Sequence, residues 1–411
     1  MSSLKGNKIP IMKHYIGLPK EIYILLMAKI INSLGRFIGP LLTLILTTKI
    51  GMSQTAAGSL MTLSMILQSP CVLIGGKLAD TIGRKRVICI FFGLSALTYL
   101  LCAFMPVSTY MAYTLILASC FASFSGSAYD AMVTDYTTPE NRQDAFSLIY
   151  MGMNIGAAIA PVIGGFLLEN HLKLLFAIDA VTTFVAIFLV GVFTKEHERV
   201  VKMVEKREEK DSEVNKNVIH VLLETPVLLE FAFIMSIYSF VYMQYGFGMP
   251  LGMNQVFGNR GAALFGIICS INALLVIFFT PLAINITRKM KIKNVLAFGG
   301  ICYGACFVVM AFSHHMTGFV VGIVLLTVGE ILCTVNTAAF IANLAKVTHL
   351  GRINSVLTII REAGGCLSPI VIGWVLKVVT IQQSFVVVAV IAVVGGVLMI
   401  GLREEGRKDC S

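Results

Sequence analysis

Charged residues are scarce in this sequence, and that scarcity settles its broad class. Only 13% of the 411 residues are charged and 57% are hydrophobic, whereas soluble globular domains carry roughly 25% charged residues. So few charges cannot cover the surface of a soluble protein of this size. The composition therefore excludes a soluble enzyme, a disulfide scaffold and a disordered chain. It indicates a polytopic membrane protein with room for about twelve spans of roughly 20 residues.

Motifs of ATP-driven and metal-dependent chemistry are also missing. The sequence has no phosphate-binding P-loop, no HExxH zinc pair and no cluster of His and Asp residues. The ten cysteines are scattered, without a CxxC pair or a Cys/His ligand spacing. We therefore expect no metal site, no cofactor and no catalytic site, and we interpret the cysteines as small apolar side chains in helix packing.

Twelve apolar stretches form two sets of six. They cover 22–47, 57–78, 87–105, 110–132, 145–168, 173–193, 226–248, 262–284, 295–313, 318–341, 354–376 and 384–402. The long polar segment 194–225 separates the sets, and its charges alternate in sign as in a solvated linker. The prediction is an all-α membrane protein with 12 transmembrane helices, in six-helix bundles at 1–193 and 226–411. We interpret 194–225 as a covalent strap, with a regulatory or docking element as the alternative.

Basic residues predict the orientation of the chain. If the spans alternate across the membrane, 25 of the 32 Lys and Arg residues lie on the side of the termini and the linker. Four lie on the opposite side, and Lys29, Arg36 and Arg361 fall within spans. Because cytoplasmic loops carry the excess of positive charge, we expect a multi-pass protein of the cell membrane with both termini in the cytoplasm.

The two halves of the sequence repeat each other. Span five contains Pro161 and Gly165, and span eleven contains Pro369 and Gly373, each 208 residues later. The loop after span two contains Asp80, and the loop after span eight contains Asn285 at nearly the same offset. Two pseudo-symmetric halves with a site near the bilayer midplane are the architecture of many secondary transporters.

The loop after span two holds the most specific motif. Residues 76–85 read GKLADTIGRK, which resembles the loop motif G-x-L-A-D-R-x-G-R-K of the major facilitator superfamily, with Thr81 in place of Arg. The resemblance covers the whole chain and implies the major facilitator fold. It also implies a cytoplasmic gate that latches the halves together, formed by Gly76, Asp80, Gly83, Arg84 and Lys85.

A stripe of small residues runs along span five. It consists of Gly152, Gly156, Ala160, Pro161, Gly164 and Gly165. The spacing permits close helix packing, and the proline bends the helix. The stripe resembles the antiporter motif of drug:proton antiporters within this superfamily, with Ala160 in place of Gly; tight packing alone is the alternative interpretation. The basic residue that those exporters carry in span four is absent here.

Charged residues inside the spans are the candidates for transport chemistry, because a charge in hydrocarbon is costly and usually faces the protein interior or a water-filled cavity. The candidate proton- and substrate-binding residues are Arg36, Asp130, Glu330, Arg361, Glu362 and Tyr242. Glu330 lies near the middle of span ten and is either a proton carrier or half of a structural pair, for example with Arg361. Tyr242 lies in a span-seven segment whose glycines and proline predict a broken helix. Asp179 is weighed equally as a solvated residue and as a functional one.

The predicted function is transport, not enzymatic catalysis. The leading hypothesis is proton-coupled multidrug efflux of lipophilic drugs or other small amphipathic compounds by alternating access. The alternatives on the same fold are a lipid or glycolipid flippase and a nutrient uptake carrier. The expected partners are a small-molecule substrate, protons and the lipid bilayer, without nucleic acid, and the expected functional unit is a monomer.

Overall fold

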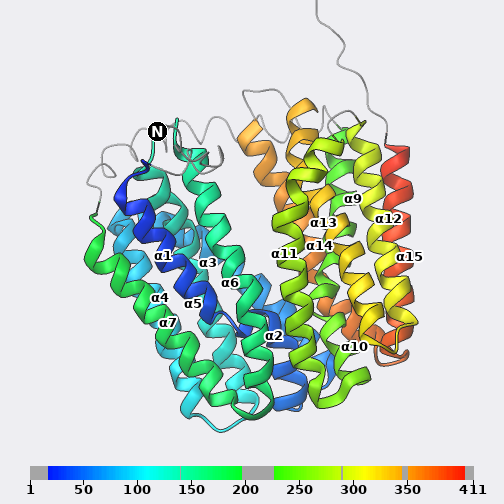
Figure 1. Ribbon diagram of the computed structural model, residues 1–411, viewed down its shortest axis with the longest axis horizontal. Helices are drawn as coiled ribbons and strands as arrows, with labels where there is room; N and C mark the ends of the chain where they lie inside the picture. The colour runs from blue at the N-terminus through cyan, green and yellow to red at the C-terminus, as the bar shows by residue number, and fades with distance from the viewer. Residues whose placement is uncertain (1–16, 139, 197–225, 288–289, 345–349, 403–411) are drawn as a thin grey trace, which may run out of the picture. The chain divides into compact units, whose positions relative to one another are not determined.

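The computed structural model describes residues 17–138, 140–196, 226–287, 290–344 and 350–402. These residues form helices joined by short connections, without β-strands in the described ranges (Figure 1). Most of the predicted linker, from residue 197 to 225, lies outside the described residues.

Each helix of the first half matches one predicted apolar stretch, except that span one is divided. The elements are α1 (Lys20–Gly35), α2 (Ile38–Leu44), the π-helical turn η2 (Ile45–Lys49), α3 (Gln54–Ile82), α4 (Arg84–Phe104), α5 (Thr109–Asp135), α6 (Arg142–Asn170) and α7 (Leu172–Phe193). The break between α1 and α2 falls at Arg36 and Phe37. Pro40 explains it, because a proline removes one helical hydrogen bond and clashes with the carbonyl four residues earlier.

The second half contains the same kind of break in span seven. Its elements are α9 (Pro226–Tyr242), η4 (Met243–Tyr245), α10 (Gly248–Phe257), η5 (Gly258–Arg260), α11 (Gly261–Thr287), α12 (Ile292–Ala311), α13 (Met316–Leu344), α14 (Leu350–Val375) and α15 (Ile381–Gly401). The predicted broken helix is confirmed, since α9 ends at Tyr242 and a 3-10 turn separates it from α10.

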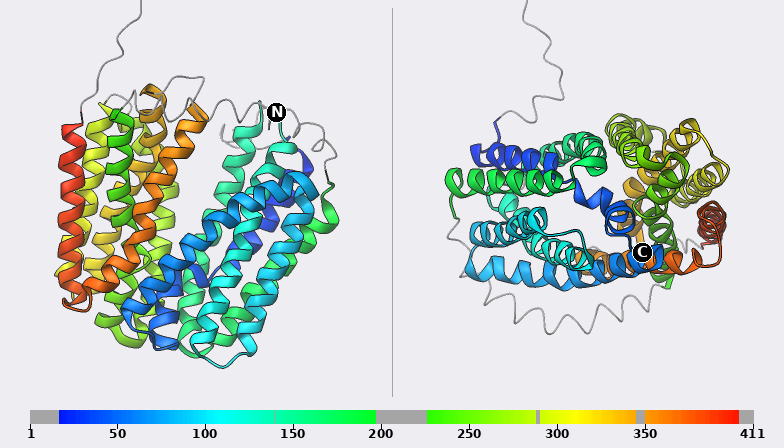
Figure 2. Two further views of the ribbon diagram at one scale, coloured as in Figure 1. Left: turned by 180° about the vertical axis from the view of Figure 1, so that it is seen from behind. Right: turned by 90° about the horizontal axis from the view of Figure 1, so that it is seen from below.

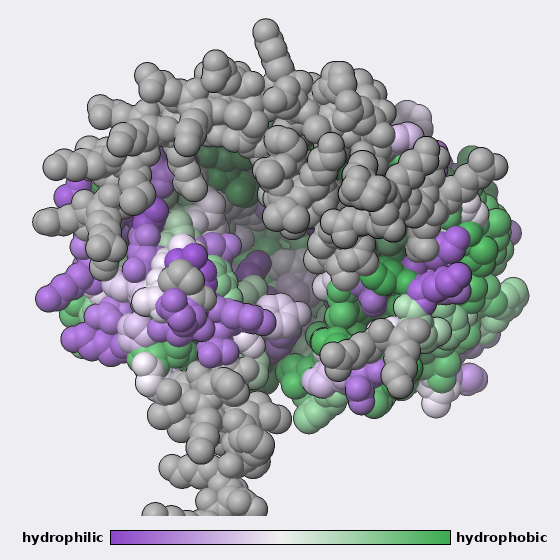
Figure 3. Space-filling view, turned by 90° about the horizontal axis from the view of Figure 1, so that it is seen from above, coloured by the Kyte–Doolittle hydropathy of each residue, from purple (hydrophilic) through white to green (hydrophobic). Residues whose placement is uncertain are grey.

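The described helices are long and apolar enough for a membrane protein. Eleven helical stretches qualify as spans, and one of them, Pro226–Thr287, has 62 residues and contains both α9 and α11. A single crossing needs about 20 residues, so this stretch is long enough for two. Large apolar side chains such as Leu73 and Phe104 are more than three-quarters exposed. In Figure 3 hydrophobic residues dominate one flank, while hydrophilic residues gather elsewhere on the viewed face.

Contacts group the chain into two compact units. Unit 1 contains Met1–Phe37, Leu67–Ala160 and His171–Val204. In it α4 packs against α5 and α7, and α7 packs against α1 (Figures 1 and 2). Its core includes the fully buried side chains of Leu25, Val87 and Val133. These contacts place α1, α5 and α7, which carry its candidate residues, around one apolar core.

Unit 2 combines the second half of the chain with segments of the first. It contains Ile38–Ile66, Pro161–Asn170 and Glu205–Ser411. In it α12 packs against α13 and α15, and α14 packs against α9. Parts of α2, α3 and α6 therefore belong to the same compact unit as the helices that follow residue 225. The division of the sequence into two six-helix bundles at the linker stays a prediction.

Candidate functional site

A hydrogen-bonded carboxylate occupies the middle of α13. The Tyr242 hydroxyl donates to Glu330 Oε1 at 2.9 Å, and Asn272 Nδ2 donates to Glu330 Oε2 at 2.9 Å. The same amide nitrogen lies 2.9 Å from Thr327 Oγ1. Three helices, α9, α11 and α13, therefore hold both carboxylate oxygens in place. The donors suit an ionised carboxylate, because hydrogen bonds to charged groups are the stronger ones.

No basic side chain of the described residues forms an ion pair with Glu330. Arg361, which the sequence offered as a partner, instead forms a 2.8 Å ion pair with the adjacent Glu362. That pair is substantially exposed, so it contributes little to stability. Within the described residues, the structure therefore does not form the predicted pair between Glu330 and Arg361.

Aromatic rings surround the Glu330 network. Tyr242 lies 6.0 Å from Tyr245 and 6.2 Å from Tyr303 between ring centroids, and Tyr245 lies 5.9 Å from Phe265. Sequence reasoning found Tyr242 but missed Tyr303 and Asn272. Asn272 carried a signal, because it is a polar residue inside an apolar span. Tyr303 carried none.

The candidates of unit 1 lie on α1, α5 and the break after α1. The Lys29 ammonium lies 4.6 Å from the centroid of the Tyr129 ring, a cation–π geometry. Asp130 and Arg36 also act electrostatically on Lys29. Arg36 and Asp130 are both exposed residues. Lys29 therefore lies within electrostatic range of both Arg36 and Asp130.

Asp179 of α7 is a buried carboxylate. Only 4% of the residue is exposed, so the interpretation as a solvated residue is wrong. Its basic neighbour is Arg36, which acts electrostatically on it. One turn further along α7, Thr183 Oγ1 accepts a 2.9 Å hydrogen bond from Asn32 of α1. The α1–α7 contact is therefore polar in this region.

The GKLADTIGRK segment forms a compact ionic turn. Gly83 has a φ of +103°, a backbone conformation that glycine adopts without strain. Arg84 forms ion pairs with Asp80, at 3.5 Å, and with Asp135 at the end of α5. Thr81, which replaces the family arginine, bonds back to the carbonyl oxygens of its own helix.

The same turn holds the residues that follow α7. Lys85 Nζ donates to the Thr194 carbonyl oxygen at 2.9 Å, and the Lys85 backbone N–H donates to Glu196 Oε1 at 3.3 Å. The Tyr136 hydroxyl donates to the Lys195 carbonyl oxygen. Burial raises the pKa of Tyr136, so its hydroxyl keeps the proton that it donates. The first three residues of the predicted linker are thus anchored to this turn.

The small-residue stripe of α6 packs against neighbouring helices along its length. A methyl group on Gly152 would overlap Leu26 and Ile30 of α1, and one on Gly156 would overlap Ser33. Ala160, Pro161, Gly164 and Gly165 are buried. Gly165 leaves no room for a side chain because the backbone of Ala262 and Ala263 lies against it. The role of the stripe in antiport stays a prediction.

Contacts within unit 2 follow the sequence repeat. Gly266 packs against the Pro161 carbonyl and Gly165 against Ala262. In the repeat, Gly58 and Gln54 are the counterparts, 208 residues earlier, of Gly266 and Ala262, and Pro369 and Gly373 are the counterparts, 208 residues later, of Pro161 and Gly165. The corresponding contacts, Gly58 against Pro369 and Gly373 against Gln54, are both present. The pair α3–α14 therefore repeats the pair α6–α11.

A hydroxyl group repairs the proline break in α14. Thr62 Oγ1 accepts from the Ile370 backbone N–H at 3.2 Å and donates to the Cys366 carbonyl oxygen at 2.8 Å. Those two backbone groups are the ones that would bond to each other in an unbroken helix. Thr62 thus takes the place of one helical hydrogen bond and ties α3 to α14.

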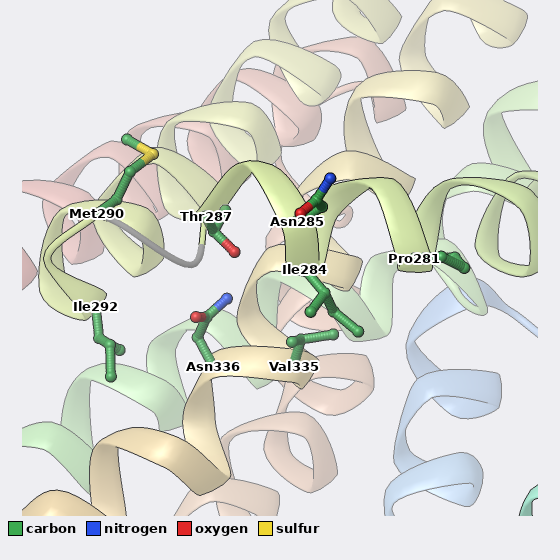
Figure 4. A pocket seen from close by; sticks show the side chains of 8 residues that line it. All are labelled: Pro281, Ile284, Asn285, Thr287, Met290, Ile292, Val335 and Asn336. Carbon is green, nitrogen blue, oxygen red and sulfur yellow. The ribbon is translucent and has the colours of Figure 1, made fainter.

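A cavity of 590 Å³ lies at one end of α11, and Glu330 is not among its lining residues. The described residues that line it are neutral: Pro281, Ile284, Asn285, Thr287, Met290, Ile292, Val335 and Asn336. Thr287 and Asn336 point toward each other across it, and Asn285 points away (Figure 4). None of the predicted transport residues lines this cavity, so its contents do not bear on their roles.

Known protein families share these features. The family model described as Major Facilitator Superfamily matches residues 25–369 and 261–409. The chain belongs to the major facilitator superfamily. It is a multi-pass membrane transporter of small molecules and not an enzyme.

Curated relatives of this transporter are distant. A Na(+), Li(+), K(+)/H(+) antiporter of Planococcus maritimus is 22% identical over 76% of this chain and 80% of its own length. A Multidrug resistance protein MdtH of Photorhabdus laumondii is 30% identical, over 36% of this chain and 37% of its own. A class H tetracycline resistance protein of Pasteurella multocida is 26% identical over 46% of this chain and 48% of its own. Their names give different activities, so these relatives support the superfamily and no particular substrate.

Solved structures confirm the fold. A peptide transporter POT in complex with sulfate covers 94% of this chain and 95% of its own, with a TM-score of 0.74 and 17% identity. A POT family transporter in complex with 5-aminolevulinic acid covers 94% of this chain and 96% of its own, with a TM-score of 0.73 and 15% identity. At this identity the likeness concerns the fold alone.

Proposed function

We propose that this transporter is a proton-coupled exporter of small amphipathic compounds and that Glu330 carries the proton. The observation that supports this role is a carboxylate in a membrane-spanning helix with two hydrogen-bond donors and no basic partner among the described residues. An unpaired charge in this position is costly. Binding a proton removes that cost, and so does binding a cationic substrate, so the two compete for one carboxylate.

The aromatic side chains support an amphipathic cargo. The rings of Tyr245 and Tyr303 lie 6.0 and 6.2 Å from that of Tyr242, whose hydroxyl donates to the carboxylate, and aromatic rings attract organic cations as well as flat apolar groups. The names of two relatives, a multidrug resistance protein and a tetracycline resistance protein, agree with this substrate class.

Exchange of protons for monovalent metal cations is the second candidate. The antiporter of Planococcus maritimus favours it. So do the oxygen atoms near Glu330: the Tyr242 hydroxyl donates to the carboxylate, and Thr327 Oγ1 accepts from the same Asn272 amide that donates to Glu330. Hard cations prefer oxygen ligands. Both candidates use the same carboxylate and differ only in the cation that displaces the proton.

Proton release from inside-out vesicles tests both candidates. Vesicles containing the transporter are acidified inside, and the loss of the pH gradient is followed after addition of ethidium, tetracycline, NaCl, LiCl or KCl. We expect ethidium to collapse the gradient and Glu330→Gln to abolish the response. Glu362→Gln, which neutralises an exposed carboxylate, and Asp130→Asn, in unit 1, are the comparison variants. A response to salts alone selects cation exchange.

Two results would overturn the proposal. An undiminished ethidium response in Glu330→Gln would remove Glu330 from coupling, and its loss in Asp130→Asn alone would assign the proton to unit 1. The absence of a response to every added compound, with the protein verified in the vesicles, would favour the flippase or nutrient carrier.

The proposal also includes cytoplasmic termini and a monomeric transporter. Protease accessibility checks the position of the termini, and the mass of the detergent-solubilised protein checks the monomeric state.

A further inference from the structure

Two cysteines, Cys71 and Cys120, lie at the contact between α3 and α5. The Cys120 thiol interacts with that of Cys71, and the Cys71 thiol donates to the Leu67 carbonyl oxygen of its own helix at 3.1 Å. Both cysteines are partly exposed. They come from different helices of the same unit, so their proximity depends on the packing of α3 on α5 and not on sequence spacing.

The register of the two helices explains why the thiols face each other. The backbone of Phe124 lies against Gly75 with no room for a side chain, so the helices touch at this level. Cys71 and Cys120 each precede those residues by four positions, one helical turn. The hydroxyl of Ser123 donates to Gln68 Oε1 at 3.1 Å. Along α3, Cys71 therefore lies between two residues that contact α5, Gln68 before it and Gly75 after it.

We propose that Cys71 and Cys120 form a dithiol site that binds a thiophilic species of low coordination number, such as a trivalent arsenical. Sulfur ligands select soft metal and metalloid centres. With phenylarsine oxide the reaction balances without an oxidant. The two S–H bonds and the arsenic–oxygen bond break, two arsenic–sulfur bonds form, one water leaves, and arsenic stays trivalent.

The position of the pair predicts a consequence for transport. Pro70 directly precedes Cys71 inside α3, and α3 passes from unit 2 to unit 1 between Ile66 and Leu67. A bridge between Cys71 and Cys120 joins α3 covalently to α5 next to the proline. Because proline interrupts the helical hydrogen bonds here, α3 is most easily bent at this point, and the bridge opposes that bending. We therefore expect bound arsenical to inhibit transport.

Mass spectrometry of the purified full chain tests the site. The protein, in a Cys410→Ser background, is treated with phenylarsine oxide and washed with excess 2-mercaptoethanol, which removes arsenic held by single thiols. We expect one phenylarsenic group per chain to survive the wash and to leave with 2,3-dimercaptopropanol. Cys71→Ala and Cys120→Ala are each expected to lose the adduct. Cys89→Ala and Cys366→Ala, which remove the other partly exposed thiols of the described residues, are expected to keep it.

Retention of the adduct in both single variants would overturn the proposal. So would its loss in Cys302→Ala, because Cys302 lies near the buried thiols of Cys306 and Cys333 and these form the competing group. Monodisperse elution of each variant shows that it is folded. The labelling result does not depend on Glu330 or on the transported substrate, so it tests the dithiol site independently of the proposed function.

Discussion

Replacing Gly58 with alanine tests whether close backbone packing joins α3 to α14. A methyl carbon on Gly58 would lie 2.8 Å from the carbonyl carbon of Pro369, whereas carbon atoms in contact are about 3.5–4.0 Å apart. The obstacle is backbone, which cannot rotate away, so the helices must separate by roughly 1 Å. Such overpacking costs about 1–3 kcal/mol, which is roughly a 5- to 140-fold change in the equilibrium between packed and separated helices.

Cys366 reports this separation, because it is partly exposed and its carbonyl oxygen accepts from Thr62 on α3. We expect N-ethylmaleimide to label Cys366 faster in Gly58→Ala, by a factor within that range, as measured by mass spectrometry of the Cys366 peptide. Gly93→Ala is the control, because a methyl group there meets nothing within 4 Å. Equal labelling rates in the two variants would refute the role assigned to Gly58.

Three further predictions concern polar contacts. Thr62→Val removes the hydroxyl that serves Ile370 N–H and the Cys366 carbonyl; unsatisfied backbone groups cost about 1–3 kcal/mol, so Cys366 labelling should accelerate, and Thr62→Ser should restore the wild-type rate. Asp135→Asn should lower the melting temperature more than Asp80→Asn, because Asp135 is the more buried partner of Arg84, with 20% of its side chain exposed against 48% for Asp80; equal shifts would contradict this. Asn272→Leu should reduce the initial rate of coupled transport more than Tyr242→Phe, because the Asn272 amide donates to Glu330 and also lies 2.9 Å from Thr327 Oγ1, whereas Tyr242→Phe removes one hydroxyl donor and keeps the ring; the reverse order in the vesicle assay would contradict it.

The fold was largely predictable because hydrophobic runs in the sequence mark the membrane spans. Hydrophobic runs of about 20 residues have few structural alternatives in a bilayer, and the proline and glycines of span seven predicted its break. The break after α1 was not predicted, although Pro40 signalled it. Helix bounds also extend beyond the apolar runs, for example to Ile82 in α3, because a helix continues past the hydrocarbon until a residue such as Gly83 ends it.

The site was only partly predictable, because partners depend on which helix faces which. Glu330 and Tyr242 were both found from the sequence, but nothing in it placed Asn272 against the carboxylate. The adjacent pair of Arg361 and Glu362 was visible in the sequence, and the pair of Arg84 and Asp135, 51 residues apart, was not. The choice between a solvated and a functional Asp179 stayed open, because depth along a helix does not show which side of the helix is buried.

Packing in this transporter follows the sequence repeat, whereas its chemistry does not. The close contacts of Gly58 and Gly266 are related by 208 residues, as are Pro161 and Pro369. The same close helix contacts thus recur in the two halves of the sequence. The residue 208 positions before Glu330 is Ala122. A carboxylate is costly in a membrane, and under the proposed function one carboxylate exchanges one proton for one cation, so Glu330 needs no acidic residue at the equivalent position of the first half.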